Sequence, residues 1–309
     1  MLRAESRPHR SGARWSGLGR IRYPPWATCT NFLQLAVYVS TAETLSKRPM
    51  EADAEEIERF ATTLERVSER VFESASIWNT EPEAGAADPK IVAVLLLIRT
   101  LSNFRGTRIL LRADRIVEAR TLARCCFENL FTIAALSEGG QRFVLEMGED
   151  HKASRKARAE FLMEQTGDMP DREWQPKLRA FIASLGKGQR KGKSLDPKKV
   201  AARGQLLKSY VYYADLSADA AHPTLDALQR YLGHAQENGE PMRTIDINPI
   251  VSPTERRRTL MMVCEALLGA CIGVIQILEL KSVNDELAAL MQEYQALVAR
   301  FPEAEGQRP

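Results

Sequence analysis

A stripe of charged residues interrupts one of the most apolar segments of the chain. Arg120, Arg124 and Glu128 follow one another at intervals of four residues, so on a helix they share one face. A helix that is apolar on most faces buries part of such a stripe, and a buried charge needs a partner. Arg124 and Glu128 can pair with each other, which leaves Arg120 in need of a second acid. The stripe is interpreted either as an internal ion-pair network or as a polar pocket in a bundle core.

A second group of polar and aromatic residues lies further along the chain. Tyr210, Tyr213 and Ser217 share a predicted helix face, and His222 stands at the break that Pro223 imposes. Histidine is the side chain that most readily changes protonation near neutral pH. An N-cap or packing role for His222 is the alternative interpretation. The candidate catalytic residues are His222, Arg124 and Glu128, and the candidate binding residues are Arg120, Arg124, Glu128, Tyr213, Ser217 and His222.

Neither group matches a motif with a known mechanism. The chain has no nucleophile motif of triad character, no H-E-x-x-H pair and no glycine-rich nucleotide turn. The four histidines, His9, His151, His222 and His234, are too scattered to predict a metal site. The five cysteines form no C-x-x-C pair, which indicates a reducing compartment without disulfides or zinc. No metal and no cofactor is predicted.

The hydrophobic periodicity predicts an all-α, multi-helix bundle with central apolar helices. The predicted helices cover residues 51–78, 91–112, 114–136, 141–166, 176–185, 205–221, 223–234, 254–280 and 284–301, with Gly139 and Gly140 ending the third. Residues 242–251 alternate and are interpreted as a short strand or an extended crossing. The basic stretch 186–199 has no P-loop order and is interpreted as a solvated loop.

The first 49 residues differ from the rest of the chain. They carry a net charge of +6, so the remaining residues carry −3. The overall charge of +3 therefore comes from this segment alone and does not indicate nucleic-acid binding. They show no sustained helical period until about Asn31, whereas Met50 opens a regular amphipathic helix. We therefore expect a poorly ordered extension at 1–49, with Met50 as a candidate natural start, and a single helical domain at 50–303. A targeting peptide and an arm for acidic partners are the alternatives.

One segment, residues 260–280, approaches the hydrophobicity of a membrane span. Glu265 and Glu279 limit its charge-free run to 13 residues, which is short of the roughly 20 that a span needs. The segment is therefore interpreted as a buried core helix, and the protein as cytoplasmic, without a membrane partner.

The motifs together resemble a bacterial family of uncharacterised helical proteins, a domain of unknown function. The resemblance rests on Arg124-x-x-x-Glu128, on Arg155 and Lys156 in the next helix, and on Tyr213-x-x-x-Ser217-x-x-x-x-His222-Pro223. It extends over roughly residues 55–280 and implies a fold but no activity.

A wider resemblance is to HEPN-type helical domains, many of which are ribonucleases of defence or toxin systems. Their pattern of an arginine followed a few residues later by a histidine is not matched before His222. Arg230 and His234 lie too close together to match it. Catalysis by this route would need an arginine from another helix, such as Arg120 or Arg124.

Three function classes follow from these patterns. The first is a module that binds an unknown ligand or protein partner, with a link to stress or phage defence. The second is a HEPN-like RNA hydrolase, in which His222 performs acid–base chemistry and Arg124 stabilises charge. The third is a structural scaffold or homo-oligomer.

Overall fold

A computed structural model describes residues 50–76, 87–165, 173–186, 195–220, 224–237, 240–248 and 251–301. The expected extension at 1–49, most of the basic stretch 186–199, and His222 with Pro223 lie outside these residues. The predictions made for them stay predictions.

The described residues form nine helices and one β-hairpin. The elements are α1 (Met50–Ser76), α2 (Pro89–Arg112), α3 (Ile116–Gln165), α4 (Trp174–Ser184), α5 (Pro197–Arg203), α6 (Tyr210–Ala220), α7 (Leu225–Gln229), β1 (Leu232–Glu237), β2 (Glu240–Ile245), α8 (Pro253–Leu278) and α9 (Asn284–Arg300). Apart from the two-stranded hairpin, the described chain is helical, which confirms the predicted all-α class.

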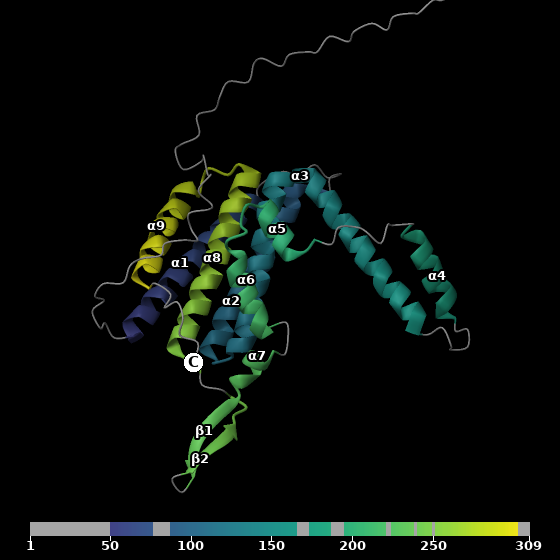
Figure 1. Cartoon of the computed structure of the whole chain (residues 1–309). Helices are drawn as coiled ribbons and strands as arrows, with labels where there is room; N and C mark the ends of the chain where they lie inside the picture. The colour runs from purple at the N-terminus through teal and green to yellow at the C-terminus, as the bar shows by residue number, and fades with distance from the viewer. Residues whose placement is uncertain are drawn as a thin grey trace, which may run out of the picture.

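The bundle is built around α8. This helix packs against α1, α2 and α3, and α9 closes the side of the bundle that α1 lines (Figure 1). Gly269 and Gly273 make the contact with α3 close, because a Cβ atom on Gly273 would stand 2.5 Å from Ile133 and one on Gly269 would stand 2.8 Å from Leu130. The small residues of α8 therefore serve helix packing.

α8 is also the one helix in the described ranges that is long and apolar enough to cross a membrane. However, 83% of its most apolar window is buried inside the protein, as expected for the core helix of a soluble protein. Its carboxylate Glu265 accepts hydrogen bonds from Tyr294 and Ser209, so the charge that interrupts the apolar run has partners inside the bundle.

Three helices begin with the same arrangement, a side-chain N-cap followed by a proline. The side chains of Asp88, Asp196 and Ser252 cap backbone amides at the starts of α2, α5 and α8, and a proline follows each cap. An uncapped helix start leaves backbone amides unpaired, and proline is tolerated there because it has no amide to lose. In α2 this proline is Pro89, the first residue of the helix.

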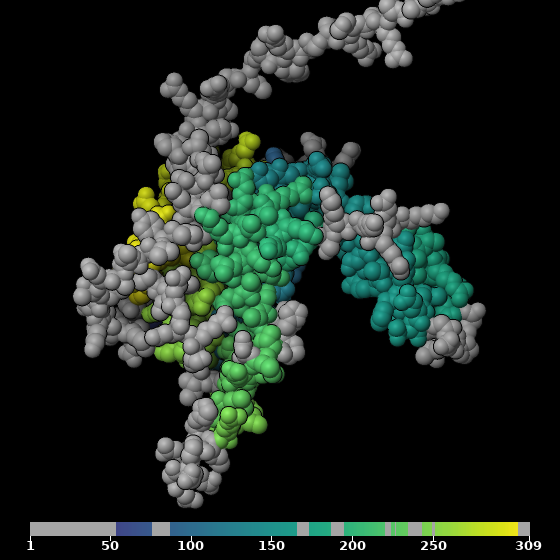
Figure 2. All heavy atoms as spheres, in the orientation of Figure 1, coloured from purple at the N-terminus to yellow at the C-terminus, as the bar shows by residue number. Residues whose placement is uncertain are grey.

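The third helix bends at Gly140, where φ is 50° and ψ is −137°. We expected Gly139 and Gly140 to end one helix and a second helix to follow, and the non-helical backbone of Gly140 confirms this: α3 consists of two helical halves joined at a kink, the second of which ends at Gln165. Residues 141–165 leave the bundle and carry α4 along their side (Figure 1). Figure 2 shows this pair, called the arm below, as a lobe that stands off from the bundle.

Several predicted boundaries between 174 and 234 were wrong. α4 begins two residues earlier than expected, α5 lies partly inside the predicted basic loop, and α6 begins at Tyr210 because turns occupy 204–209. The helix predicted at 223–234 is mostly absent: α7 has five residues, and His234 belongs to β1. β1 pairs with β2 in antiparallel register, with Leu232 opposite Ile245, so the strand interpretation of 242–251 holds for its first residues.

Candidate functional site

Arg124 stands at the centre of a cluster formed by two facing helices. Its Nε donates a hydrogen bond to Ser217 Oγ at 3.0 Å, and one terminal nitrogen reaches both Glu128 Oε1 at 2.8 Å and Tyr213 Oη at 3.0 Å. Tyr213 in turn donates to Glu128 Oε1 at 3.1 Å. Each helix contributes two residues one turn apart, because residues four positions apart share a helix face. The structure thus brings the R-x-x-x-E and Y-x-x-x-S pairs into one cluster.

Two residues of this cluster, Arg124 and Tyr213, keep their protons near neutral pH. Partial burial disfavours the charge on Arg124, but the hydrogen bond with Tyr213 and the charge of Glu128 outweigh it and raise the pKa of the guanidinium. Burial raises the pKa of Tyr213 as well, so the phenol keeps its proton near neutral pH. The guanidinium also lies 5.1 Å from the centre of the Tyr213 ring, within cation–π range. Arg124 is therefore a permanent cation whose position is set by α6.

Arg120 belongs to a separate, deeper network. It is 4% exposed and pairs with Asp215 at 2.9 Å and with Asp219, both on α6. Further arginines join the same acids and Glu255 of α8: Arg230 lies 2.8 Å from Asp219 and 3.2 Å from Glu255, and Arg258 lies 3.5 Å from Asp215. Three arginines and three carboxylates thus cross-link α3, α6, α8 and Arg230, the residue after α7. This is the internal ion-pair network that was one of the two interpretations of the charged stripe.

A hollow of about 270 Å³ adjoins the Arg124 cluster at the bend of α3. Glu128 is its one charged lining residue, and its walls come from both halves of α3 and from the start of α5. The lining residues are Glu128, Phe131, Thr132, Phe143, Met147, Leu195, Pro197 and Val200. Sequence reasoning found Glu128 but missed the hollow, because its walls join segments about 70 residues apart in sequence.

Arg203 fastens the arm next to this hollow. Its guanidinium lies 4.7 Å from the centre of the Phe143 ring and pairs with Glu146, both beyond the bend. The hydrogen bond from Arg203 lowers the pKa of Glu146. The backbone amide of Leu195 donates to Asp150 Oδ1 at 3.1 Å, which ties the chain before α5 to the same helix. The arm is thus held to the bundle on the side where the hollow lies.

The two basic residues of the family resemblance in the charged helix lie away from the cluster. Arg155 lies 4.8 Å from the centre of the Phe181 ring, and Lys156 donates to the Gly186 carbonyl at 2.9 Å. Both contacts hold α4 and its C-terminal end against α3. Their role in the described structure is to build the arm.

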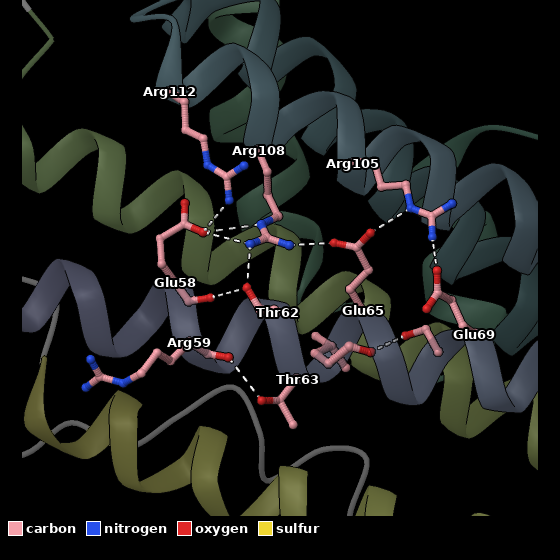
Figure 3. Close-up of polar contacts among 11 residues, drawn as sticks. Glu58, Arg59, Thr62, Thr63, Glu65, Glu69, Arg105, Arg108 and Arg112 are labelled. Atoms are coloured by element: carbon pink, nitrogen blue, oxygen red, sulfur yellow. Dashed lines mark hydrogen bonds and ion pairs between the residues drawn. The ribbon is translucent and has the colours of Figure 1, made fainter.

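A third charged network, between α1 and α2, was not anticipated from the sequence (Figure 3). Arg108, 6% exposed, pairs with Glu58 at 2.9 Å and with Glu65, and donates to Thr62 at 2.7 Å. Arg105 and Arg112 extend the ladder at its exposed ends. The signal was present in the spacing of Glu58 and Glu65, seven residues apart on α1, but their arginine partners lie on another helix.

The histidines do not complete a site among the described residues. His151 is exposed on the arm, while His222 lies outside the described ranges, so its distance to Arg124 stays a prediction to be tested. Over the same ranges, no three His, Cys, Asp or Glu side chains come together as metal ligands. Arg124 acts here as a positioning residue, because its bonds go to neighbouring protein groups.

A comparison with known families places the cluster in context. Residues 90–241 match the model of DUF5677, a family of unknown function. The DUF5677 match confirms the resemblance to an uncharacterised family, over a shorter range than the expected 55–280. It contains Arg124, Glu128, Tyr213 and Ser217 and every residue that lines the hollow, but neither α8 nor α9. No curated protein and no solved structure gives a significant match.

Proposed function

We propose that the protein is a small-molecule-binding helical module whose ligand occupies the hollow at the bend of α3. The observation that carries the proposal is the make-up of the walls, which are apolar on most sides and include one carboxylate, Glu128. Ligand sites in proteins are typically concave and largely apolar, with a few polar groups that fix the orientation of the ligand. A volume of about 270 Å³ suits a small molecule better than a peptide or an RNA segment.

The surroundings of Glu128 support this proposal. Arg124 and Tyr213 both bind the same carboxylate oxygen, so the side chain is held in one orientation before any ligand arrives. A polar group that is already ordered loses little conformational entropy on binding, which favours affinity. The hydrogen-bonded cluster of α3 and α6 is then the support of a binding group, and the deeper Arg120 network anchors both helices.

A substitution that fills the hollow tests the proposal. Thr132 lines the hollow, and its hydroxyl bonds only to the backbone carbonyl one turn earlier in its helix, at 2.7 Å. We expect Thr132→Phe to place a ring in the hollow and abolish the binding of small apolar fragments. Ligand-observed NMR with a fragment mixture measures this directly.

The matched control is Thr121→Phe on the same helix. Thr121 is also half-buried and makes the same backbone bond, at 3.0 Å to Val117, but does not line the hollow. Fragments should bind this variant as they bind the wild type. Equal binding to wild type and Thr132→Phe would reject the hollow as the ligand site.

A further inference from the structure

The two oxygens of Glu128 are used unequally. Oε1 accepts from both Arg124 and Tyr213, whereas Oε2 has no protein partner among the described residues. The side chain is 33% exposed, and the same residue lines the hollow. A carboxylate oxygen can only accept hydrogen bonds. A molecule that fills the hollow and uses this oxygen must therefore present a donor.

The other lining residues narrow the class of donor. Six of the remaining seven are apolar, and the seventh, Thr132, uses its hydroxyl proton on its own helix. The body of the ligand must accordingly be apolar, with its polarity gathered at the end that meets Glu128. A hydrogen bond between an ionised donor and a carboxylate is about twice as strong as one between neutral groups. An ammonium group satisfies both conditions better than a hydroxyl.

The nearby arginines do not cancel this preference. Arg124 binds Oε1, so an ammonium on Oε2 lies closer to the carboxylate than to the guanidinium, and the Coulomb energy falls with distance. Arg203, another cation beside the hollow, is paired with Glu146 and lies over the Phe143 ring. Lys198 of α5 lies 5.9 Å from the centre of the Tyr210 ring. The carboxylate is therefore the charge nearest to a group bound at Oε2, and its attraction favours a cation there.

We infer that the ligand is a primary amine with a short apolar body, bound with its ammonium on Glu128 Oε2 and its body among Phe131, Met147 and Val200. This inference rests on the proposed function, since it names the chemical class that the same hollow takes. Neither acids nor plain alcohols of the same shape satisfy the site as well, because acids meet a carboxylate and alcohols bring a weaker donor.

The test compares three probes of equal length on the intact chain. Binding of n-pentylamine, 1-pentanol and pentanoate is measured by ligand-observed NMR titration near pH 7, where the amine is charged. The amine should bind wild type at least about tenfold more tightly than the alcohol, the gap expected for a charge-assisted bond. Pentanoate should show no binding. This comparison needs no variant, so it stands even if a substitution disturbs folding.

Two variants then test whether Glu128 is the carboxylate that binds the ammonium group. Glu128→Gln should bring the amine to the affinity of the alcohol, while Glu118→Gln, an exposed position in the first turn of the same helix, should leave it unchanged. If amine and alcohol bind wild type equally and Thr132→Phe loses both, the hollow is a ligand site but the amine class is wrong. If no probe binds wild type and the fragment screen is also negative, the proposed function fails together with this inference.

Discussion

At the scale of single residues, several buried charged side chains of the described ranges hold helices together, whereas Glu128 faces a hollow. Arg108 and Arg120 are buried and meet carboxylates on other helices, so each joins segments that the chain keeps far apart. Glu128 differs from them because it also lines the hollow, while its Oε1 is bonded to Arg124 and Tyr213. Position beside the hollow, rather than burial, separates the two roles, because the side chains of Glu58 and Glu128 are 32% and 33% exposed.

Arg108 offers a direct test of what a buried arginine contributes. Arg108→Ala removes the partner of Glu58 and Glu65 and leaves a gap beside Phe104, so we expect a loss of about 3 kcal/mol in the free energy of unfolding. Arg105→Ala, in the same ladder but 44% exposed, should lose less than about 1 kcal/mol. Urea denaturation measures both. Equal losses would show that burial of Arg108 adds nothing.

The stripe of the third helix shows how far sequence reasoning reaches at this scale. Four-residue spacing correctly predicted that Arg124 pairs with Glu128 and that Arg120 needs another acid. It could not name Asp215 and Asp219 as those acids, because they approach only when α6 packs on α3. Sequence spacing describes a helix face, whereas the partner on a second helix depends on tertiary packing.

At the scale of elements, long helices were predictable and short ones were not. α1, α2, α8 and α9 lie within a few residues of their predicted ends, because many turns repeat the same apolar period. The first residues of β1, up to His234, were predicted as helix, although Asn238-Gly239, a strong signal for a two-residue hairpin turn, follows Glu237 in the sequence. The apolar period of α7 was extended past its real end at Gln229, so the turn signal was overlooked.

The backbone conformation of Gly140 allows a test at the scale of the helix. Its φ of 50° with ψ of −137° lies in a region that side chains with a Cβ avoid, and nothing stands within 4 Å of a Cβ placed there. Gly140→Ala should therefore cost about 1–3 kcal/mol of stability from backbone strain alone. Thermal and urea unfolding measure the change.

A second glycine of the same helix supplies the control. Gly148 is exposed and helical, and a Cβ there also meets nothing within 4 Å. Gly148→Ala should raise stability by about 0.5–1 kcal/mol, since alanine is the better helix former. A stabilising Gly140→Ala would mean that α3 straightens without penalty and that the bend is not imposed by the backbone.

At the scale of the whole molecule, the core holds several groups that resist losing a proton. Burial raises the pKa of the Cys271 thiol to about 12, although its contact with Ser68 works in the opposite direction. Burial, with Glu265 nearby, raises the pKa of Tyr294 well above its usual value. Cys126 and Cys264 shift in the same direction because both are fully buried. All of these groups lie in one continuous core.

This core predicts loss of stability in alkali. A group with a raised native pKa keeps its proton in the native state after the unfolded chain has released it, so stability is complete below the unfolded pKa and falls above it. For Cys271 the fall begins near pH 9.0 and continues to about 12. Urea unfolding at a series of pH values should show this decline, and Cys271→Ala should make it shallower. A free energy of unfolding that stays level from about pH 8 to about pH 11 would contradict it.

The bend at Gly140 means that a small rotation there moves the far end of the arm by a much larger distance. Residues 141–165 extend beyond it, which at about 1.5 Å per residue makes a rod of roughly 37 Å with the hollow at its fulcrum. A rotation of about 10° at the fulcrum would carry the far tip through roughly 6 Å, a displacement that follows from this rod length. Since the walls of the hollow belong to both the rod and its base, a guest that alters their separation by a fraction of an ångström changes the reach of the arm by much more.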